Sequence, residues 1–228
     1  MKETLSSYRL LIFDWDGTLI DSPARIINCL QQACREAGCM IPTREAIRGI
    51  IGLSFGPAYD VLLPGTDETT RNAVSERYRD LFFHLDDTPM PLFEGVLEHL
   101  HHLRDLGYFI AIATGKSRSG LNHVLHELGM TKFFHSTRCA DETAAKPNPL
   151  MLHEILDELN IDLREAVMVG DSSYDLEMAL NAGMDSIAVT SGAHDAEHLA
   201  QFKPVAMHSV VTDFLPTPPN YAQSRQRP

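Results

Sequence analysis

Two carboxylates and a glycine follow the first apolar run of this chain without any spacer. The run Leu10–Phe13 leads directly into the segment Asp14–Thr18, which reads Asp-Trp-Asp-Gly-Thr. Successive side chains of an extended strand point to opposite faces, so Asp14 and Asp16 are expected to project together. Neighbouring carboxylates repel each other, and each is stabilised by a proton, a cation or a hydrogen-bond donor. Taken alone, the segment fits either a cation site or an acidic loop in solvent.

Further polar residues lie beside other predicted strands and helices. Thr114 follows a second apolar run, and Asp171 and Asp175 follow a third. Lys146 precedes a proline and a helical pattern. Because proline disfavours the helical conformation of the residue before it, we expect Lys146 to be extended.

Short apolar runs alternate with helical patterns along most of the chain. Strands are expected at Arg9–Phe13, Tyr108–Ala113, Phe133–Ser136, Ala166–Gly170 and Ser186–Thr190, with a weaker one at Val205–His208. Helices are expected near Val96–Leu106, Ser119–Leu128, Leu150–Asn160 and Tyr174–Ala182. This alternation predicts an α/β fold with a doubly wound parallel sheet. Such sheets bind ligands outside the carboxyl ends of their strands, where the polar segments are expected to lie.

Residues 20–87 interrupt this alternation, because the only patterns there are helical. Helices are expected at Ala24–Ala37, Arg44–Ile51, Pro57–Leu63 and Glu68–Leu85. Prolines near both ends of the segment favour boundaries there. We therefore expect a helical cap at 20–87 above the strand ends, a catalytic core at 1–19 and 88–215, and a disordered tail at 216–228.

Composition and charge argue against several classes of partner. The chain has 228 residues and a net charge of −12, which argues against nucleic acid and against anionic membrane surfaces. No apolar segment approaches the roughly 20 residues of a membrane span, and we expect no signal peptide, because no long apolar region precedes the first strand. The four cysteines form neither a CxxC pair nor a zinc spacing, so we expect reduced thiols and a cytoplasmic location.

In combination, these segments resemble the motifs of the haloacid dehalogenase superfamily. That family carries DxDGT after its first strand, a Thr or Ser after a later strand, a Lys before a helix, and GDxxxD. This chain has them in the same order, at Asp14–Thr18, Thr114, Lys146 and Gly170–Asp175. The helical insert resembles the cap of the phosphoglycolate phosphatase-like subgroup, and the core implied is Rossmann-like.

The resemblance implies a Mg²⁺-dependent phosphatase that works through an aspartyl-phosphate. Asp14 is the implied nucleophile, and Asp16 the implied general acid and then base. The implied metal ligands are Asp14, Asp16 through its carbonyl oxygen, and Asp171. Asp175 would support metal-bound water or orient the ligands.

The resemblance also implies which residues receive the phosphoryl group. Thr114 and Gly115 would bind its oxygens, and Lys146 would balance its charge and that of the nucleophile. Ser172 and Lys116 are expected to support the loops.

Three features narrow the reaction within the family. Asp16 favours phosphoryl chemistry, because haloacid dehalogenases lack the second carboxylate. Residues 20–87 contain no lysine, which excludes the Schiff-base chemistry of phosphonoacetaldehyde hydrolases. β-Phosphoglucomutases place an arginine in a cap loop where this chain has Phe55, which weakens a mutase assignment without excluding it.

The resemblance implies that the substrate is a small phosphorylated metabolite, with 2-phosphoglycolate as the leading candidate. Short sugar phosphates, pyrophosphate and nucleotides stay open. Arg48, Gly52 and Phe55 are the candidate specificity residues of the cap. Two non-enzymatic alternatives are a phosphoryl-accepting signalling module and a catalytically inactive scaffold. The helical insert argues against the first, and the undamaged motifs argue against the second.

Overall fold

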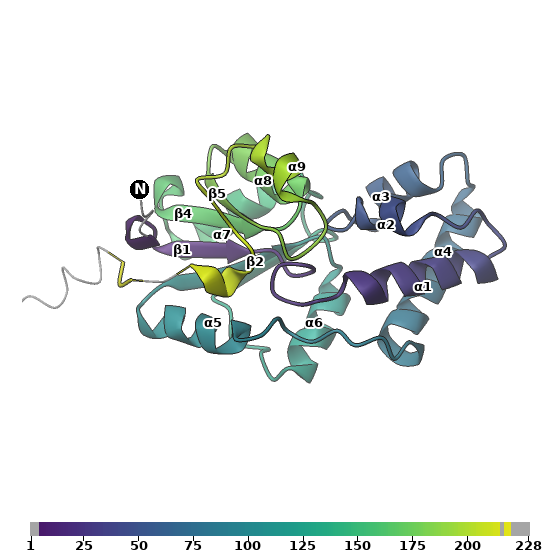
Figure 1. Cartoon of the computed structure of the whole chain (residues 1–228), viewed down its shortest axis with the longest axis horizontal. Coiled ribbons are helices and arrows are strands. Elements are labelled where there is room, and N and C mark those ends of the chain that lie inside the picture. Colours follow the sequence, from purple (N-terminus) through teal and green to yellow (C-terminus); the bar gives the residue numbers. More distant parts are fainter. Residues whose placement is uncertain (1–4, 215–216, 220–228) are drawn as a thin grey trace, which may run out of the picture.

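A parallel sheet forms the centre of the computed structural model, which describes residues 5–214 and 217–219. Within these residues the sheet has six strands in the order β3-β2-β1-β4-β5-β6 (Figure 1). All neighbouring strands are parallel. The strands are β1 Leu10–Phe13, β2 Phe109–Thr114, β3 Ser136–Cys139, β4 Ala166–Gly170, β5 Asp185–Val189 and β6 Ala206–His208. The predicted doubly wound α/β fold is confirmed.

The first strand lies at the centre of the sheet because every residue of it is apolar and buried. Its four residues are fully buried, as expected for a parallel strand covered on both faces. Leu11 and Phe13 point into a cluster with residues of α5 (Val96–Asp105) and α6 (Arg118–Glu127). Leu10 and Ile12 point to the opposite face, against α7 (Leu150–Leu159) and α8 (Ser173–Ala182).

The remaining short elements border these layers. They are α9 Ala196–Ala200 and the 3₁₀ turns η1 Leu5–Ser7, η3 Leu163–Glu165 and η4 Val211–Asp213. Neither α9 nor these turns were expected from the sequence. None of the described helices is long and apolar enough to cross a membrane.

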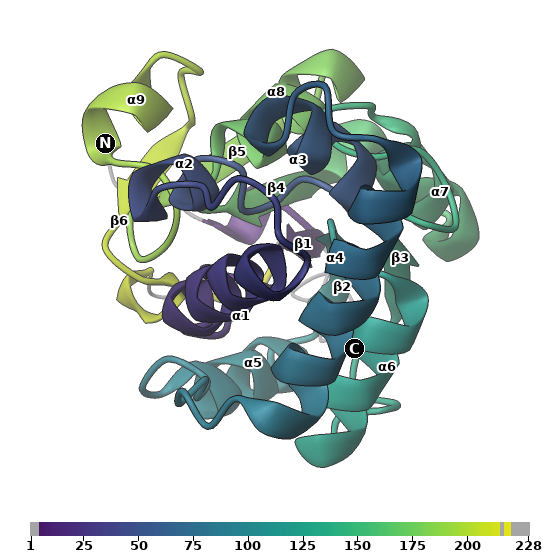
Figure 2. The same cartoon turned by 90° about the vertical axis from the view of Figure 1, so that its right-hand side faces the viewer.

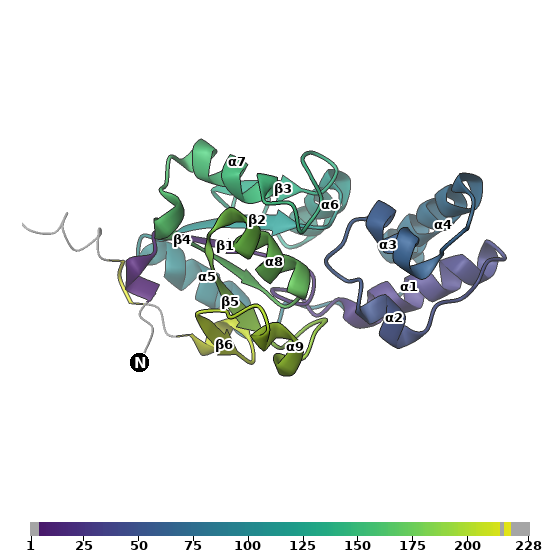
Figure 3. The same ribbon diagram turned by 90° about the horizontal axis from the view of Figure 1, so that it is seen from above.

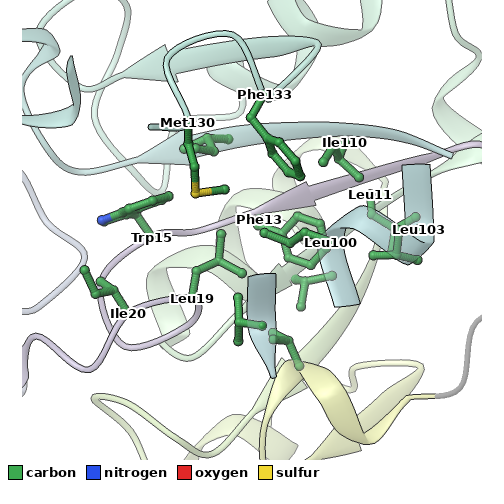
Figure 4. Packing of buried hydrophobic residues seen from close by; sticks show 14 of the residues in the cluster. Leu11, Phe13, Trp15, Leu19, Ile20, Leu100, Leu103, Ile110, Met130 and Phe133 are labelled. Carbon is green, nitrogen blue, oxygen red and sulfur yellow. The ribbon is translucent and has the colours of Figure 1, made fainter. Parts of the chain in front are cut away.

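One predicted strand is wrong. Residues 133–135 form a turn, and the strand begins at Ser136 instead of ending there. The apolar pair Phe133 and Phe134 suggested a strand, but Phe133 belongs to the hydrophobic cluster that includes Leu11 and Phe13 (Figure 4), and Phe134 packs against that cluster. The edge strand itself is mostly polar, and the side chain of Arg138 forms ion pairs with Glu154 and Glu158.

Residues 20–87 form a helical lobe beyond the carboxyl ends of the strands (Figures 1 and 2). Its elements are α1 Pro23–Glu36, α2 Arg44–Arg48, α3 Phe55–Leu62, α4 Glu68–Asp80 and the π-helical turn η2 Leu81–Leu85. No described residue of this lobe belongs to the sheet. The second helix is shorter than predicted, because the chain turns at Gly49 and continues as a loop to Ser54.

The lobe has a hydrophobic cluster of its own, separate from those around the sheet. Ile27, Leu30, Ile47 and Leu62 belong to it and are nearly inaccessible to solvent. The view from above shows the sheet and the lobe side by side, joined at the strand ends (Figure 3). The division into a core at 1–19 and 88–215 and a cap at 20–87 stays a prediction. Most of the predicted tail at 216–228 lies outside the described residues.

Candidate active site

The turn after β1 directs the side chains of Asp14 and Asp16 away from the hydrophobic cluster. Trp15 is fully buried in the hydrophobic cluster, while its carbonyl oxygen accepts a hydrogen bond from the Leu19 nitrogen at 3.0 Å. Gly17 closes this turn with a φ of +84°, a conformation that favours glycine. The alternation therefore sends Trp15 inward and leaves Asp14 and Asp16 at the mouth of the sheet.

Three carboxylates converge at this mouth. Asp14, Asp171 and Asp175 each place one oxygen within 4.8 Å of the others. None of the three is more than 1% exposed. They converge because Asp14 follows the end of β1 and Asp171 and Asp175 follow the end of β4, and these two strands pair in parallel with Phe13 opposite Val169. Burial and this proximity both favour the protonated form of a carboxyl group.

Asp171 is fixed by two donors. The Thr18 hydroxyl donates to Oδ1 at 2.6 Å, and the Ala193 backbone nitrogen donates to Oδ2 at 2.8 Å. Burial, followed by the charge of Asp175, nevertheless raises the pKa of Asp171 to about 7. The carboxylate is therefore well oriented but short of positive charge.

Lys146 lies between the other two carboxylates. Its Nζ is 2.7 Å from Asp14 Oδ1 and 2.6 Å from Asp175 Oδ1. Burial alone would lower the pKa of Lys146, but Asp14 and Asp175 outweigh it and raise the pKa, so the side chain is charged. For Asp14 burial dominates and raises the pKa, against the lowering effect of Lys146. Asp175 also accepts hydrogen bonds from Ser172 Oγ at 2.6 Å and Ser172 N at 3.1 Å.

Asp16 belongs to a second charged pair beside this group. Its Oδ2 lies 3.0 Å from Lys116 Nζ, and both side chains are about one-tenth exposed. The Lys116 ammonium also lies 4.6 Å from the ring centroid of Phe82, in the helical lobe. The Thr114 hydroxyl accepts a hydrogen bond from the Lys116 backbone nitrogen at 3.2 Å. Lys116, expected only to support its loop, thus contacts a carboxylate directly.

The carboxylate group fits a divalent cation. When all three carboxyl groups are ionised, the single positive charge of Lys146 balances only one of the three negative charges. Asp14 Oδ2 is buried and has no hydrogen-bond partner among the described residues. An all-oxygen donor set of this kind suits Mg²⁺. The Asp16 carboxylate is not part of the group, so a role for Asp16 as ligand would fall to its backbone carbonyl.

A cavity of about 100 Å³ opens between the strand ends and the helical lobe. Asp14, Asp16, Thr114 and Gly115 form its floor. The lobe contacts this floor closely, because a Cβ placed on Gly115 would overlap the Gly52 carbonyl oxygen.

Only two of the three candidate specificity residues line the cavity. Gly52 and Phe55 line the cavity, whereas Arg48 is not among its lining residues. Arg48 Nη1 instead lies 3.4 Å from the Gly192 carbonyl oxygen, at the junction with the core.

Sequence reasoning missed four lining residues of α4 and η2. These are Tyr78, Arg79, Phe82 and Phe83. The i, i+4 spacing of Tyr78 with Phe82 and of Arg79 with Phe83 places them on one helix face, and this was the available signal.

The family follows from a match along most of the chain. Residues 11–189 match the family of haloacid dehalogenase-like hydrolases. The chain belongs to this family. The predicted recognition is thereby confirmed, and the matched residues include every polar segment described above.

Curated relatives support the same enzyme class in this hydrolase family. The chain is 36% identical over 200 residues to "Probable phosphatase IndB" of Dickeya dadantii, covering 86% of each protein. It is 33% identical over 210 residues to pyrophosphatase PpaX of Listeria welshimeri, covering 90% of this chain and 94% of the relative. Over 209 residues it is 29% identical to phosphoglycolate phosphatase of Vibrio vulnificus, covering 88% and 92%. The prediction of a phosphatase is confirmed at this level.

A solved structure supports the fold of this haloacid dehalogenase-like hydrolase. A Bacteroides fragilis protein assigned to the same family superposes with a TM-score of 0.84 at 25% identity. The match covers 91% of this chain and 100% of that chain. The helical lobe and the sheet are thus both parts of a known architecture.

Proposed function

We propose that this haloacid dehalogenase-like hydrolase is a Mg²⁺-dependent phosphatase that forms an aspartyl-phosphate on Asp14. The observation that carries the proposal is the position of Asp14. Asp14 lines the cavity and belongs to the three-carboxylate group. One of its oxygens lies beside Lys146, and the other has no hydrogen-bond partner in the part of the chain that the structure describes. An oriented carboxylate with a free oxygen is suited to attack phosphorus.

The residues of the site divide the reaction between them. The free oxygen of Asp14 forms the new bond to phosphorus as the bond to the leaving alcohol breaks. Asp16 in its acid form gives the alcohol its proton, then takes one from the water that hydrolyses the aspartyl-phosphate. Lys146 offsets the negative charge of Asp14 and the phosphoryl group, and Thr114 and Gly115 line the place where its oxygens would lie.

Mg²⁺ would be held by Asp14 and Asp171, with the Asp16 carbonyl oxygen as the predicted third ligand. When bound, it would neutralise negative charge between the nucleophile and the phosphoryl group. Asp175 supports this arrangement by holding Lys146 and Ser172.

The substrate we propose is a small phosphorylated metabolite, and residues 20–87 form the cap over it. The sequence-based leading candidate is 2-phosphoglycolate. The named relatives include both a phosphoglycolate phosphatase and a pyrophosphatase, so their names do not select one compound. The cytoplasmic location and the absence of nucleic-acid and membrane partners stay predictions.

The test is phosphate release from 2-phosphoglycolate, hexose phosphates, nucleotides, pyrophosphate and p-nitrophenyl phosphate. Each compound is assayed with Mg²⁺ and with EDTA. Asp14→Asn should lower turnover by more than about 1000-fold, because it removes the nucleophile. Asp157→Asn, at an exposed position on α7, is the matched control and should leave turnover unchanged.

The variant Asp16→Asn tests the general-acid role of Asp16 independently of the nucleophile Asp14. It should lower turnover of alkyl phosphates more than that of p-nitrophenyl phosphate, whose leaving group needs no proton. Substantial turnover by a folded Asp14→Asn protein would contradict the assignment of Asp14. Equal losses on all esters would contradict that of Asp16.

A further inference from the structure

The cavity above Asp14 is apolar in nearly all of its upper wall. Five rings of the helical lobe line it, from Phe55, Tyr59, Tyr78, Phe82 and Phe83. Between them lie aliphatic side chains, namely Ile26, Leu30, Ile50, Ile51 and Leu53. A wall of this composition gains free energy by covering an apolar group and loses it by covering a charge without a partner.

The rings are arranged as an ordered stack. Phe55 and Tyr59 are stacked, with centroids 5.6 Å apart and planes at 26°. Tyr78 and Phe82 are stacked in the same way, at 5.5 Å and 27°. The edge of one pair meets the face of the other, since Phe55 and Tyr78 lie 5.3 Å apart at 79°. Such packing fixes the ring orientations and gives the cavity a defined shape.

Positive charge is scarce among the side chains that line the cavity. Of the described residues that line it, Lys116 and Arg79 alone are cationic. Lys116 is paired with Asp16 at 3.0 Å. Arg79 is an exposed residue, and its guanidinium lies 5.7 Å from the Phe55 ring centroid. Among the described lining residues, Arg79 alone would remain for a second anionic group on a substrate, and it lies at an exposed position.

We propose that the physiological substrate is a phosphomonoester whose leaving group is apolar and planar, as in an aromatic alcohol. This inference rests on the proposed phosphatase function and specifies its substrate class. The phosphoryl group lies at Asp14, and the leaving group packs against the rings around Phe55. On this basis benzyl phosphate ranks ahead of 2-phosphoglycolate and pyrophosphate, whose second anionic group would lie against the apolar wall.

The test compares kcat/KM for benzyl phosphate, 2-phosphoglycolate, glycerol 2-phosphate and methyl phosphate. All four release an alcohol, so the comparison reports on the leaving-group site more than on leaving-group acidity. Benzyl phosphate should exceed each of the others by about ten-fold or more, which corresponds to burial of one ring in a fitted site.

Substitutions in the apolar wall test whether the preference for benzyl phosphate arises from contact with Phe55. Phe55→Ala should lower the ratio of kcat/KM for benzyl phosphate to that for methyl phosphate by about ten-fold, and Phe55→Leu should lower it less. Val61→Ala is the matched control, because Val61 is a 62% exposed apolar residue of α3 and does not line the cavity. As a check that needs no variant, benzylphosphonate should inhibit the wild-type enzyme about ten-fold better than methylphosphonate.

Three results would overturn the inference. The first is a preference for 2-phosphoglycolate or pyrophosphate that Arg79→Gln abolishes, because Arg79 would then select a second anion. The second is equal kcat/KM for benzyl and methyl phosphate, with p-nitrophenyl phosphate still hydrolysed, which would leave the phosphatase function intact. The third is no turnover of any ester, p-nitrophenyl phosphate included, and this alone would contradict the proposed function as well.

Discussion

Removing the ammonium of Lys146 should destabilise the fold as well as the reaction. Lys146 Nζ lies 2.7 Å from Asp14 and 2.6 Å from Asp175, and all three side chains are at most 2% exposed. Lys146→Met keeps the length of the side chain and leaves both carboxylates buried without it. Breaking a buried ion pair from one side costs about 3–5 kcal/mol. We therefore expect the free energy of unfolding to fall by about 3 kcal/mol or more at pH 8.

The pH dependence of that loss distinguishes charge from packing. Burial raises the pKa of Asp14 in the folded state, and without Lys146 the pKa would rise further. A carboxyl group whose folded pKa is raised destabilises the fold once the unfolded chain has ionised, so the penalty grows as pH rises above about 4. The difference between the wild type and Lys146→Met should thus be larger at pH 8 than at pH 5.

Urea unfolding in EDTA measures both quantities. Trp15, the single tryptophan, is fully buried next to Asp14 and reports unfolding by fluorescence. The control is Lys132→Met at an exposed position, which should change stability by less than about 0.5 kcal/mol. A loss below about 1 kcal/mol for Lys146→Met at pH 8 would refute the reasoning. So would a loss that is larger at pH 5.

Three further predictions concern the site and the core. Gly17→Ala should destabilise the fold by about 1–3 kcal/mol in urea unfolding, because φ is +84° and the new Cβ would overlap the Asp171 carboxylate. Mg²⁺ should raise the melting temperature of the wild type but not of Asp171→Asn, and equal shifts would contradict Asp171 as a ligand. Burial and His102 lower the pKa of His99 to about 4, from 6.5 when unfolded, so stability should fall as pH falls from about 6.5 to about 4. His99→Gln should flatten that slope in thermal melts at several pH values, and an unchanged slope would contradict it.

The sheet was predictable because its strands are encoded locally. Buried parallel strands such as Leu10–Phe13 and Ala166–Gly170 are continuous apolar runs, and each is followed by polar residues. The edge strand Ser136–Cys139 was misplaced for the same reason. Its polar sequence gives no such signal, whereas Phe133 beside it is apolar on account of its place in the core.

The charged site was partly predictable. Ligands bind at the carboxyl ends of parallel strands, and this rule predicted from the sequence that Asp14, Thr114, Lys146 and Asp171 lie close together. The partners of each charge were not predictable in this way. Lys146 pairs with Asp14 and Asp175, and Lys116 with Asp16. These pairs join separate loops that lie far apart in the chain, so no local pattern specifies them.

By itself the sequence determined the order of the elements, the helical insert and the motif residues at the strand ends, because hydrophobic periodicity and turn residues act over a few positions. Only the tertiary structure decided that Arg48 lies at the junction with the core while Arg79 and five aromatic rings of the lobe line the cavity. The side of a helix that meets a ligand depends on how the insert docks against the sheet. That docking is the sum of many contacts between residues far apart in the chain, and no local pattern records it.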